Sequence, residues 1–259
     1  MKKTMMLILI VLSIVLLGCA KEETIEKVPA EEAGEEYIEP KQTTGVSKRV
    51  TLTTDDGIGL VASYYPGREN AVILLHMLNR DRSDWKEFAS KLNKRGYTVI
   101  APDLRGHGDS DLNWMSFKDP DFQKMVNDVA AAADYIYRKN EVDIESVYVV
   151  GASIGANLAV MYGVTDPNVK KVVMLSPGST YHGLNPLDAV FDFNKPILLV
   201  YSQRDTYSAN SARTMEEMGK AERKMIAYRD SHAHGTDMFA EHDTAGDDLE
   251  QDIIDFIKS

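Results

Sequence analysis

The sequence predicts one three-layer α/β domain over residues 47–259, with a mostly parallel eight-stranded sheet between layers of helices. Two observations predict it. Short runs rich in β-branched residues alternate with longer amphipathic segments, and this order is typical of parallel strands with helices on both faces. Most of the short runs are apolar throughout, as strands that are covered on both faces require.

The domain is expected to open with two extended segments, at 47–54 and 58–65, because the turn signal Asp55-Asp56-Gly57 separates them. The other six strands are expected at 71–75, 97–101, 146–150, 169–175, 196–201 and 223–227, and the helices at 83–95, 121–139, 154–163, 208–219 and 247–258. No repeat of fixed period interrupts this order, so a second domain is not needed.

The composition excludes several classes of protein. The 259 residues are 44% apolar and 27% charged, which argues against a disordered or a fibrous chain. The formal net charge of −11 argues against nucleic-acid binding, since that function needs a basic face. The single cysteine, Cys19, excludes an internal disulfide and a cysteine-based zinc site. No cofactor is expected.

The first residues have the pattern of an export signal. Two lysines precede an apolar run at 5–17, which is shorter than the about 20 residues that a membrane span needs. The run ends in Leu-Leu-Gly-Cys at 16–19, which resembles the lipobox of prokaryotic lipoprotein signals. The resemblance implies a signal peptide at 1–18 and lipid chains on Cys19; the alternative is an uncleaved N-terminal anchor helix. Either arrangement predicts an extracytoplasmic protein attached to a membrane.

Residues 19–46 are expected to be a flexible tether. Glutamates outnumber lysines in this segment, and Pro29, Gly34 and Pro40 interrupt any helix. Because like charges repel one another, the segment is expected to stay extended and to hold the folded domain away from the membrane.

Residues 151–155 read Gly-Ala-Ser-Ile-Gly and lie between an expected buried strand and an expected helix. In this context the G-x-S-x-G pattern predicts a sharp turn that projects the Ser153 hydroxyl above the sheet. The Ile154 N–H and the start of the following helix would point at the same space and favour a developing negative charge there. The alternative is a glycine-rich connection in which Ser153 only caps a helix.

Five segments in order resemble the α/β-hydrolase family. They are the oxyanion loop at 74–78, with Met77 in place of the usual glycine, the D-x-R-G-x-G-x-S turn at 103–110, the nucleophile elbow at 151–155, the acid loop at 200–205 and the histidine loop at 233–235. The resemblance covers most of residues 47–259 and implies the α/β-hydrolase fold.

A serine hydroxyl needs a base, and that base is expected to be a histidine oriented by an acid. The family's chain order is serine, acid, histidine. It implies Ser153, Asp205 after a buried strand, and His234, which Gly235 follows; His232 is the alternative base. The resemblance also implies an oxyanion hole made of backbone N–H groups from Ile154 and from Leu78 or Met77.

His232 and His234, with Asp237 or His242, can also be read as a metal cluster. Their spacing lacks the i, i+4 histidine pair of metalloproteases, and no cysteine assists. We therefore expect no metal.

Only residues 176–195 separate two of the expected strands, which is too short for a multi-helix cap over the site. An open site suits small or medium esters. The candidate walls are Trp114, Met115, Phe117, Tyr181 and Phe191, although loop packing explains these side chains equally well.

The compact form resembles carboxylesterases and dienelactone-hydrolase-like proteins, although the latter typically have cysteine at the position of Ser153. The sequence therefore predicts a membrane-tethered serine carboxylesterase; the alternatives are a peptidase or acyl-amide hydrolase, and a catalytically inactive hydrolase fold that binds ligands as a lipoprotein.

Overall fold

A computed structural model describes residues 44–139, 144–219, 221–240 and 248–259. The signal peptide, Cys19, the tether up to residue 43 and His242 lie outside the described residues. Within the described part of the chain, no helix combines the length and the apolar character that crossing a membrane requires.

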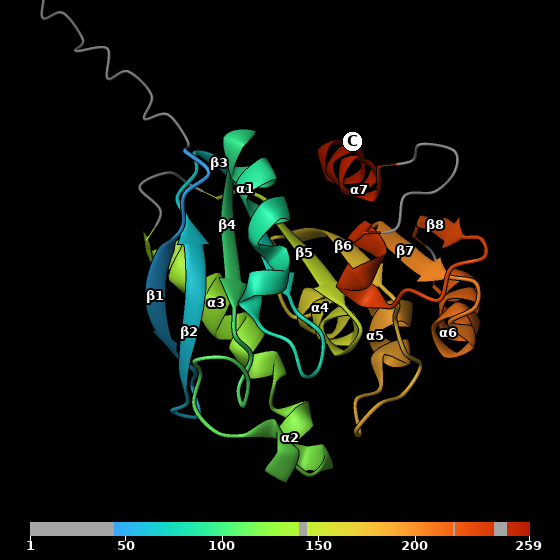
Figure 1. Cartoon of the computed structure of the whole chain (residues 1–259), viewed down its shortest axis with the longest axis horizontal. Helices are drawn as coiled ribbons and strands as arrows, with labels where there is room; N and C mark the ends of the chain where they lie inside the picture. Colours follow the sequence, from blue (N-terminus) through green and yellow to red (C-terminus); the bar gives the residue numbers. More distant parts are fainter. Residues whose placement is uncertain (1–43, 140–143, 220, 241–247) are drawn as a thin grey trace, which may run out of the picture. The chain divides into compact units, whose positions relative to one another are not determined.

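The described residues form an eight-stranded sheet with the order β1-β2-β4-β3-β5-β6-β7-β8 (Figure 1). The strand β2 pairs antiparallel with β1 and with β4, and every later pair is parallel, which confirms the predicted mostly parallel sheet. The strands are β1 (Lys48–Thr53), β2 (Gly59–Tyr65), β3 (Glu69–Leu75), β4 (Tyr97–Pro102), β5 (Val147–Ala152), β6 (Val169–Leu175), β7 (Ile197–Ser202) and β8 (Arg223–Tyr228).

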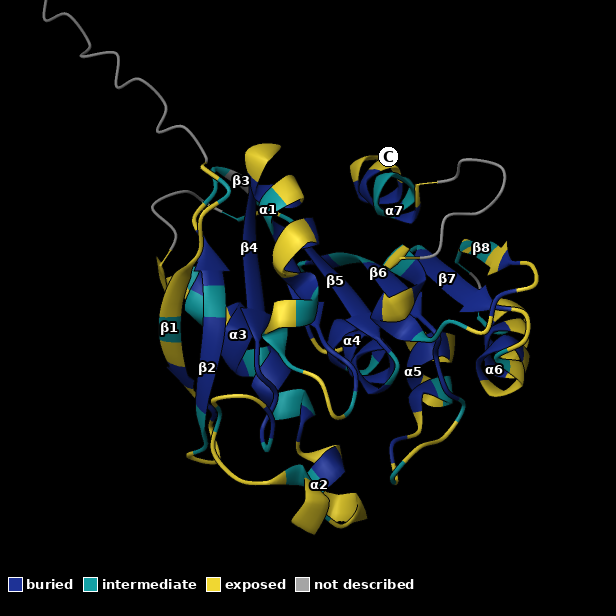
Figure 2. Cartoon of the chain, viewed as in Figure 1, coloured by how far each residue is buried: buried dark blue, intermediate teal, exposed yellow. Residues whose placement is uncertain are grey.

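Helices cover both faces of the sheet (Figure 1). On one face lie α1 (Lys86–Lys94) and α7 (Leu249–Lys258); on the other lie α3 (Val126–Lys139), α4 (Ile154–Gly163), α5 (Pro186–Asp192) and α6 (Thr206–Glu216). Successive residues of β5 alternate between these layers. Val149 belongs to the core cluster that includes residues of α3, α4 and α6, and Val150 belongs to the cluster that includes residues of α1 and α7. Full burial of such a side chain contributes about 1.5–3 kcal/mol. The central strands are accordingly dark blue in Figure 2.

Two helical regions differ from the expectation. The helix expected at 121–139 is divided into α2 (Asp119–Gln123) and α3, because Met125 and Asp128 donate their backbone N–H groups to carbonyls only three residues back and tighten the chain between the two helices. No helix was expected between the strands at 169–175 and 196–201, where the structure has α5, which begins at Pro186. This helix has seven residues, too few for an apolar period to be visible in the sequence.

Candidate active site

Ser153 occupies a strained turn at the carboxyl end of β5. It lies between the end of β5 at Ala152 and the start of α4 at Ile154, with φ 54° and ψ −115°. A non-glycine residue in such a conformation costs roughly 1–3 kcal/mol, so the surroundings must hold it in place. The Ser153 N–H donates to the carbonyl of Leu175 at 2.8 Å, which fixes the turn to the neighbouring strand β6.

The two glycines of the turn are required by close backbone contacts. A Cβ atom at Gly151 would lie 2.1 Å from the carbonyl oxygen of Gly155, and a Cβ atom at Gly155 would lie 2.4 Å from the carbonyl oxygen of Leu75. Both distances are far shorter than a van der Waals contact. The two glycines of the G-x-S-x-G pattern are therefore needed because α4 starts so close to the neighbouring backbone that a side chain at either position would collide with it.

His234 forms a hydrogen bond with Asp205 across 29 residues of sequence. The His234 Nδ1 atom lies 2.6 Å from Oδ2 of Asp205, and the two side chains are 41% and 15% exposed. Asp205 follows the end of β7 and caps α6, because its Oδ1 accepts the backbone N–H of Ser208 at 3.4 Å. This contact at Nδ1 leaves the Nε2 atom of His234 for proton transfer, which is the arrangement that a general base needs.

The loop that carries His234 is fixed on the C-terminal side of this residue. The Gly235 N–H donates to Oγ of Ser176 at 2.8 Å, and Ser176 itself follows the end of β6. Asp237, which the sequence offered as a metal ligand, accepts a hydrogen bond from Arg80 at 2.7 Å. His232 is exposed. Among the described residues, no group of three or more His, Cys, Asp or Glu side chains could hold a metal ion.

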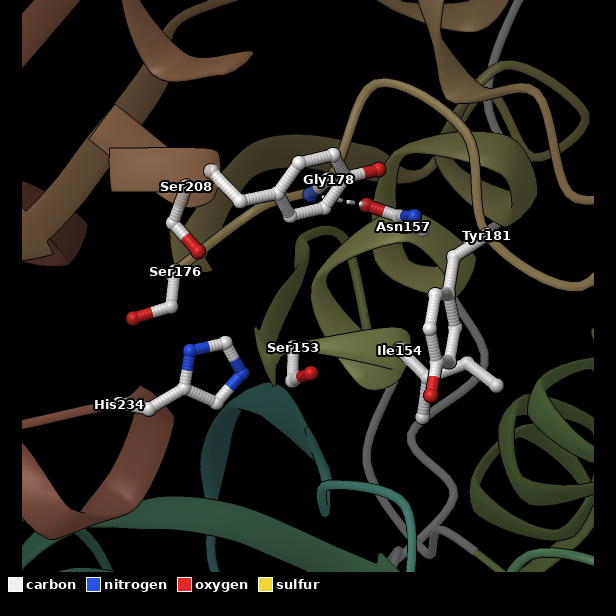
Figure 3. A pocket seen from close by; sticks show the side chains of 9 residues that line it. Ser153, Ile154, Asn157, Ser176, Gly178, Tyr181, Ser208 and His234 are labelled. Atoms are coloured by element: carbon white, nitrogen blue, oxygen red, sulfur yellow. Dashed lines mark hydrogen bonds between the residues drawn. The ribbon is translucent and has the colours of Figure 1, made fainter. Parts of the chain in front are cut away.

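A cavity of about 250 Å³ brings Ser153 and His234 together at the carboxyl ends of the parallel strands (Figure 3). Open α/β sheets bind their ligands at this edge. Of the predicted site residues, Ser153, Ile154, Tyr181 and His234 border the cavity. The cavity has five further lining residues that the sequence did not predict: Asn157, Ser176, Gly178, Tyr207 and Ser208. The signal that could have found Ser176 is its position directly after the end of β6.

Four of the five predicted wall residues lie outside the set that lines this cavity. Trp114 stacks on His107, with ring centroids 5.8 Å apart and planes 6° apart, and Phe117 packs edge-on against Phe122, so both rings belong to loop and core packing. Met115 and Phe191 are 74% and 60% exposed. These four side chains therefore pack against other residues or face solvent, and their part in a substrate pocket stays a prediction.

The oxyanion loop after β3 is held by a buried histidine. The His76 Nδ1 atom lies 2.7 Å from the carbonyl oxygen of Met77, and its Nε2 atom accepts the backbone N–H of Leu104 at 2.9 Å. Burial, with a smaller contribution from His107, lowers the pKa of His76 to about 3, so the ring is neutral and its Nδ1–H is the donor. His76 therefore ties the loop after β3 to the loop after β4.

The three predicted oxyanion donors occupy two places. Ile154 lies on the cavity wall at the start of α4, where the first N–H groups of a helix have no partner within the helix. Met77 is buried beneath the histidine loop, since a Cβ atom at Gly235 would lie 2.2 Å from its sulfur atom. Met77 and Leu78 are not among the residues that line the cavity, so a donor from this loop stays a prediction.

The D-x-R-G-x-G-x-S turn is held by side-chain hydrogen bonds. The Arg105 guanidinium donates to Asp128 at 2.8 Å and to Asp56 at 2.7 Å, and its hydrogen bonds hold the pKa of Asp56 well below its usual value. Ser110 donates to the carbonyl oxygen of Asp103, and the Asp103 carboxylate accepts from Arg82. These contacts give the motif a structural role in closing the turn after β4.

Comparisons with known proteins agree with this architecture. A family model described as serine aminopeptidase, S33, matches residues 67–192, which is just under half of the chain. A carboxylesterase of Bacillus subtilis is 33% identical over 113 residues, 44% of this chain and 44% of that protein. A bifunctional esterase/perhydrolase of Acinetobacter calcoaceticus is 31% identical over 130 residues, 48% of this chain and 43% of that protein.

Among solved structures, an esterase of Pyrococcus furiosus has a TM-score of 0.68 at 20% identity, over 82% of this chain and 91% of that one. The matched segments span 32% to 54% of the length of the first curated relatives. The protein has the α/β-hydrolase fold.

Proposed function

We propose that this protein is a serine hydrolase that cleaves carboxylic esters through an acyl-enzyme intermediate. The observation that carries the proposal is a strained Ser153 on the wall of a cavity that also contains His234, whose Nδ1 atom is engaged by Asp205. The esterase relatives supply the reaction class, since a carboxylesterase and a bifunctional esterase/perhydrolase are among them.

In the proposed mechanism, the Ser153 Oγ atom attacks the ester carbonyl carbon while Nε2 of His234 takes the hydroxyl proton. Asp205 holds the imidazole with its proton at Nδ1 and stabilises the imidazolium that forms. The carbonyl oxygen becomes an oxyanion next to the Ile154 N–H and the start of α4; one such donor is worth roughly 3–4 kcal/mol in known cases. His234 then protonates the leaving alcohol.

The second half of the reaction repeats these steps with water. His234 takes a proton from the water molecule, the resulting hydroxide attacks the acyl carbon, and Ser153 leaves with the proton from His234 while the carboxylic acid departs. The cavity of about 250 Å³ lies just below the about 300–1,000 Å³ typical of ligand pockets, which favours a short ester.

The replacement Ser153→Ala tests the proposal. Turnover of p-nitrophenyl butyrate should fall by roughly three orders of magnitude or more, because the variant has no nucleophile. Circular dichroism should show an unchanged fold, since alanine adds no bulk to the turn. Turnover equal to that of the wild type would rule out Ser153 as the nucleophile.

An amide is the second candidate substrate, because the matching family model is described as a serine aminopeptidase. Amide cleavage needs protonation of a poorer leaving group by the same His234. Comparing kcat/KM for butyryl p-nitroanilide and p-nitrophenyl butyrate separates the two activities. A higher kcat/KM for the anilide than for the ester would favour the peptidase activity. A chain that hydrolyses neither and does not react with a fluorophosphonate would be the inactive binding lipoprotein.

The proposal includes attachment to a membrane through lipid on Cys19, with the domain on the extracytoplasmic side. Its support is the export-signal pattern of residues 1–18 and the Leu-Leu-Gly-Cys sequence at its end. The full chain expressed in a bacterium should partition into detergent, and Cys19→Ser should move it to the aqueous phase, because two or more lipid chains are needed for stable attachment. Equal partitioning of the two forms would exclude lipidation.

A further inference from the structure

Ser208 places a buried hydroxyl on the cavity wall. It is the third residue of α6, it lines the cavity beside His234, and its side chain is fully buried. Its Oγ atom has no hydrogen-bond partner in the described part of the chain. In Figure 3 this hydroxyl points into the cavity. Buried polar groups are nearly always hydrogen-bonded, so an unpaired one next to a catalytic pair calls for an explanation.

The neighbouring polar groups of the wall are engaged within the protein. Oδ1 of Asn157 accepts the Gly178 N–H at 3.1 Å. The Tyr207 hydroxyl accepts the Thr180 N–H at 3.2 Å and donates to the carbonyl oxygen of the same residue. These contacts build the loop after β6 onto α4 and α6. The Ser208 hydroxyl makes no such contact within the described residues, so a ligand can engage it.

The position of Ser208 is fixed to the catalytic pair. Its backbone N–H donates to Oδ1 of Asp205, and the other oxygen of this carboxylate contacts His234. One carboxylate therefore orients both the imidazole and the first turn of the helix that carries Ser208. A group held in this way is preorganised, so binding to it costs little conformational entropy.

We propose that Ser208 is a specificity-determining residue whose hydroxyl hydrogen-bonds to a polar oxygen of the substrate next to the scissile ester. The inference rests on the proposed ester hydrolysis. A serine hydroxyl both donates and accepts, so it pairs with an alcohol or a carbonyl oxygen. The preferred substrates are then short esters that carry a hydroxyl group on the acyl chain or on the alcohol. The Tyr181 ring and the Ile154 side chain supply the adjoining apolar wall.

Three esters of matched size test this inference: ethyl butyrate, ethyl 3-hydroxybutyrate and 2-hydroxyethyl butyrate. The measured quantity is kcat/KM for each hydroxylated ester divided by kcat/KM for ethyl butyrate, so that the fraction of folded enzyme cancels. The wild type should prefer one of the hydroxylated esters. The preferred ester shows whether the acyl chain or the alcohol faces Ser208. Ser208→Ala should reduce that preference by about three- to tenfold, the effect of one lost hydrogen bond.

Two further variants separate recognition from packing. Ser208→Thr keeps the hydroxyl and should keep the preference. Ser211→Ala changes another buried serine of α6, whose Oγ accepts hydrogen bonds from Ser179, and should leave the preference ratio at the wild-type value. A wild type without preference for either hydroxylated ester, or a Ser208→Ala variant that retains the full preference, overturns the inference.

Labelling with a fluorophosphonate distinguishes the two levels of failure. An enzyme that is labelled and hydrolyses ethyl butyrate, but whose preference does not depend on Ser208, refutes the role of Ser208 and leaves ester hydrolysis standing. A wild type that is neither labelled nor active on any of the three esters refutes both.

Discussion

Two histidines lie in loops at the carboxyl edge of the sheet, and their surroundings differ in every respect that matters for proton transfer. His76 is fully buried, both of its ring nitrogens have backbone partners, and its pKa is lowered to about 3. His234 is 41% exposed, one ring nitrogen contacts Asp205, and the ring borders the cavity that contains Ser153. The first arrangement fixes a loop, and the second leaves a nitrogen for a reacting proton.

A position at the carboxyl edge of the sheet does not by itself make a histidine a general base. A general base needs an accessible nitrogen, a neighbour that fixes its tautomer, and a proton donor within reach. His234 is partly exposed, its Nδ1 atom contacts Asp205, and it shares a cavity with Ser153. In His76 both ring nitrogens already have backbone partners, so this residue ties the loop after β3 to the loop after β4.

Replacing His234 should have the largest effect on activity. His234→Ala removes the base and should lower kcat/KM for p-nitrophenyl butyrate by roughly three orders of magnitude or more. His232→Ala is the matched control, because His232 is two residues away and exposed, and it should retain activity close to that of the wild type. The opposite ranking of the two variants would identify His232 as the base.

Replacing Asp205 separates catalysis from helix capping. Asparagine is as good an N-cap as aspartate, so Asp205→Asn should change the Tm only slightly. The same change donates a hydrogen bond where the imidazole needs an acceptor, and kcat should fall by roughly 10³- to 10⁴-fold, as in known triads. A large loss of Tm with little loss of kcat in the folded fraction would make Asp205 a structural cap only.

The smallest effect is expected at His76, in the pH dependence of stability. Because its pKa is lower in the folded protein than its usual value near 6.5, only the unfolded chain takes up a proton between pH 6.5 and about 3. Stability from this group is therefore present above pH 6.5 and is lost as the pH falls; the loss at pH 5.5 is about 1.4 kcal/mol.

Urea unfolding of the wild type and of His76→Gln at pH 7.5 and pH 5.5 measures this contribution. The variant should be less stable at pH 7.5 and should lose less stability on acidification than the wild type does. An identical loss in both proteins would mean that His76 accepts a proton in the folded state.

The sequence predicts the parts of this molecule that depend on local chemistry. Strands such as β5 are apolar at nearly every position. The turn at Ser153 can be recognised by its two glycines, which the close approach of the neighbouring backbone requires. The pairing of His234 with Asp205 was expected from the order of motifs along the chain, and the two side chains are in contact.

The parts that depend on distant contacts were not visible. Ser176 directly follows β6, whereas Ser208 lies in α6, 32 residues later along the chain. Nothing in the neighbours of Ser208 indicates that the two residues share a cavity. Trp114 is an aromatic side chain of the kind that often lines a pocket, but its ring stacks on His107 and does not line the cavity. The short α5 and the break between α2 and α3 are likewise decided by tertiary packing and backbone hydrogen bonds.

The most direct test of the central claim is covalent labelling of the folded protein with a fluorophosphonate, followed by mass spectrometry of its peptides. Only an activated serine reacts readily with this reagent. We expect one adduct per chain, on Ser153, and strongly slowed labelling in the His234→Ala and Asp205→Asn variants. An adduct on a different serine, or labelling of Ser153 that proceeds equally fast without His234, would contradict the account.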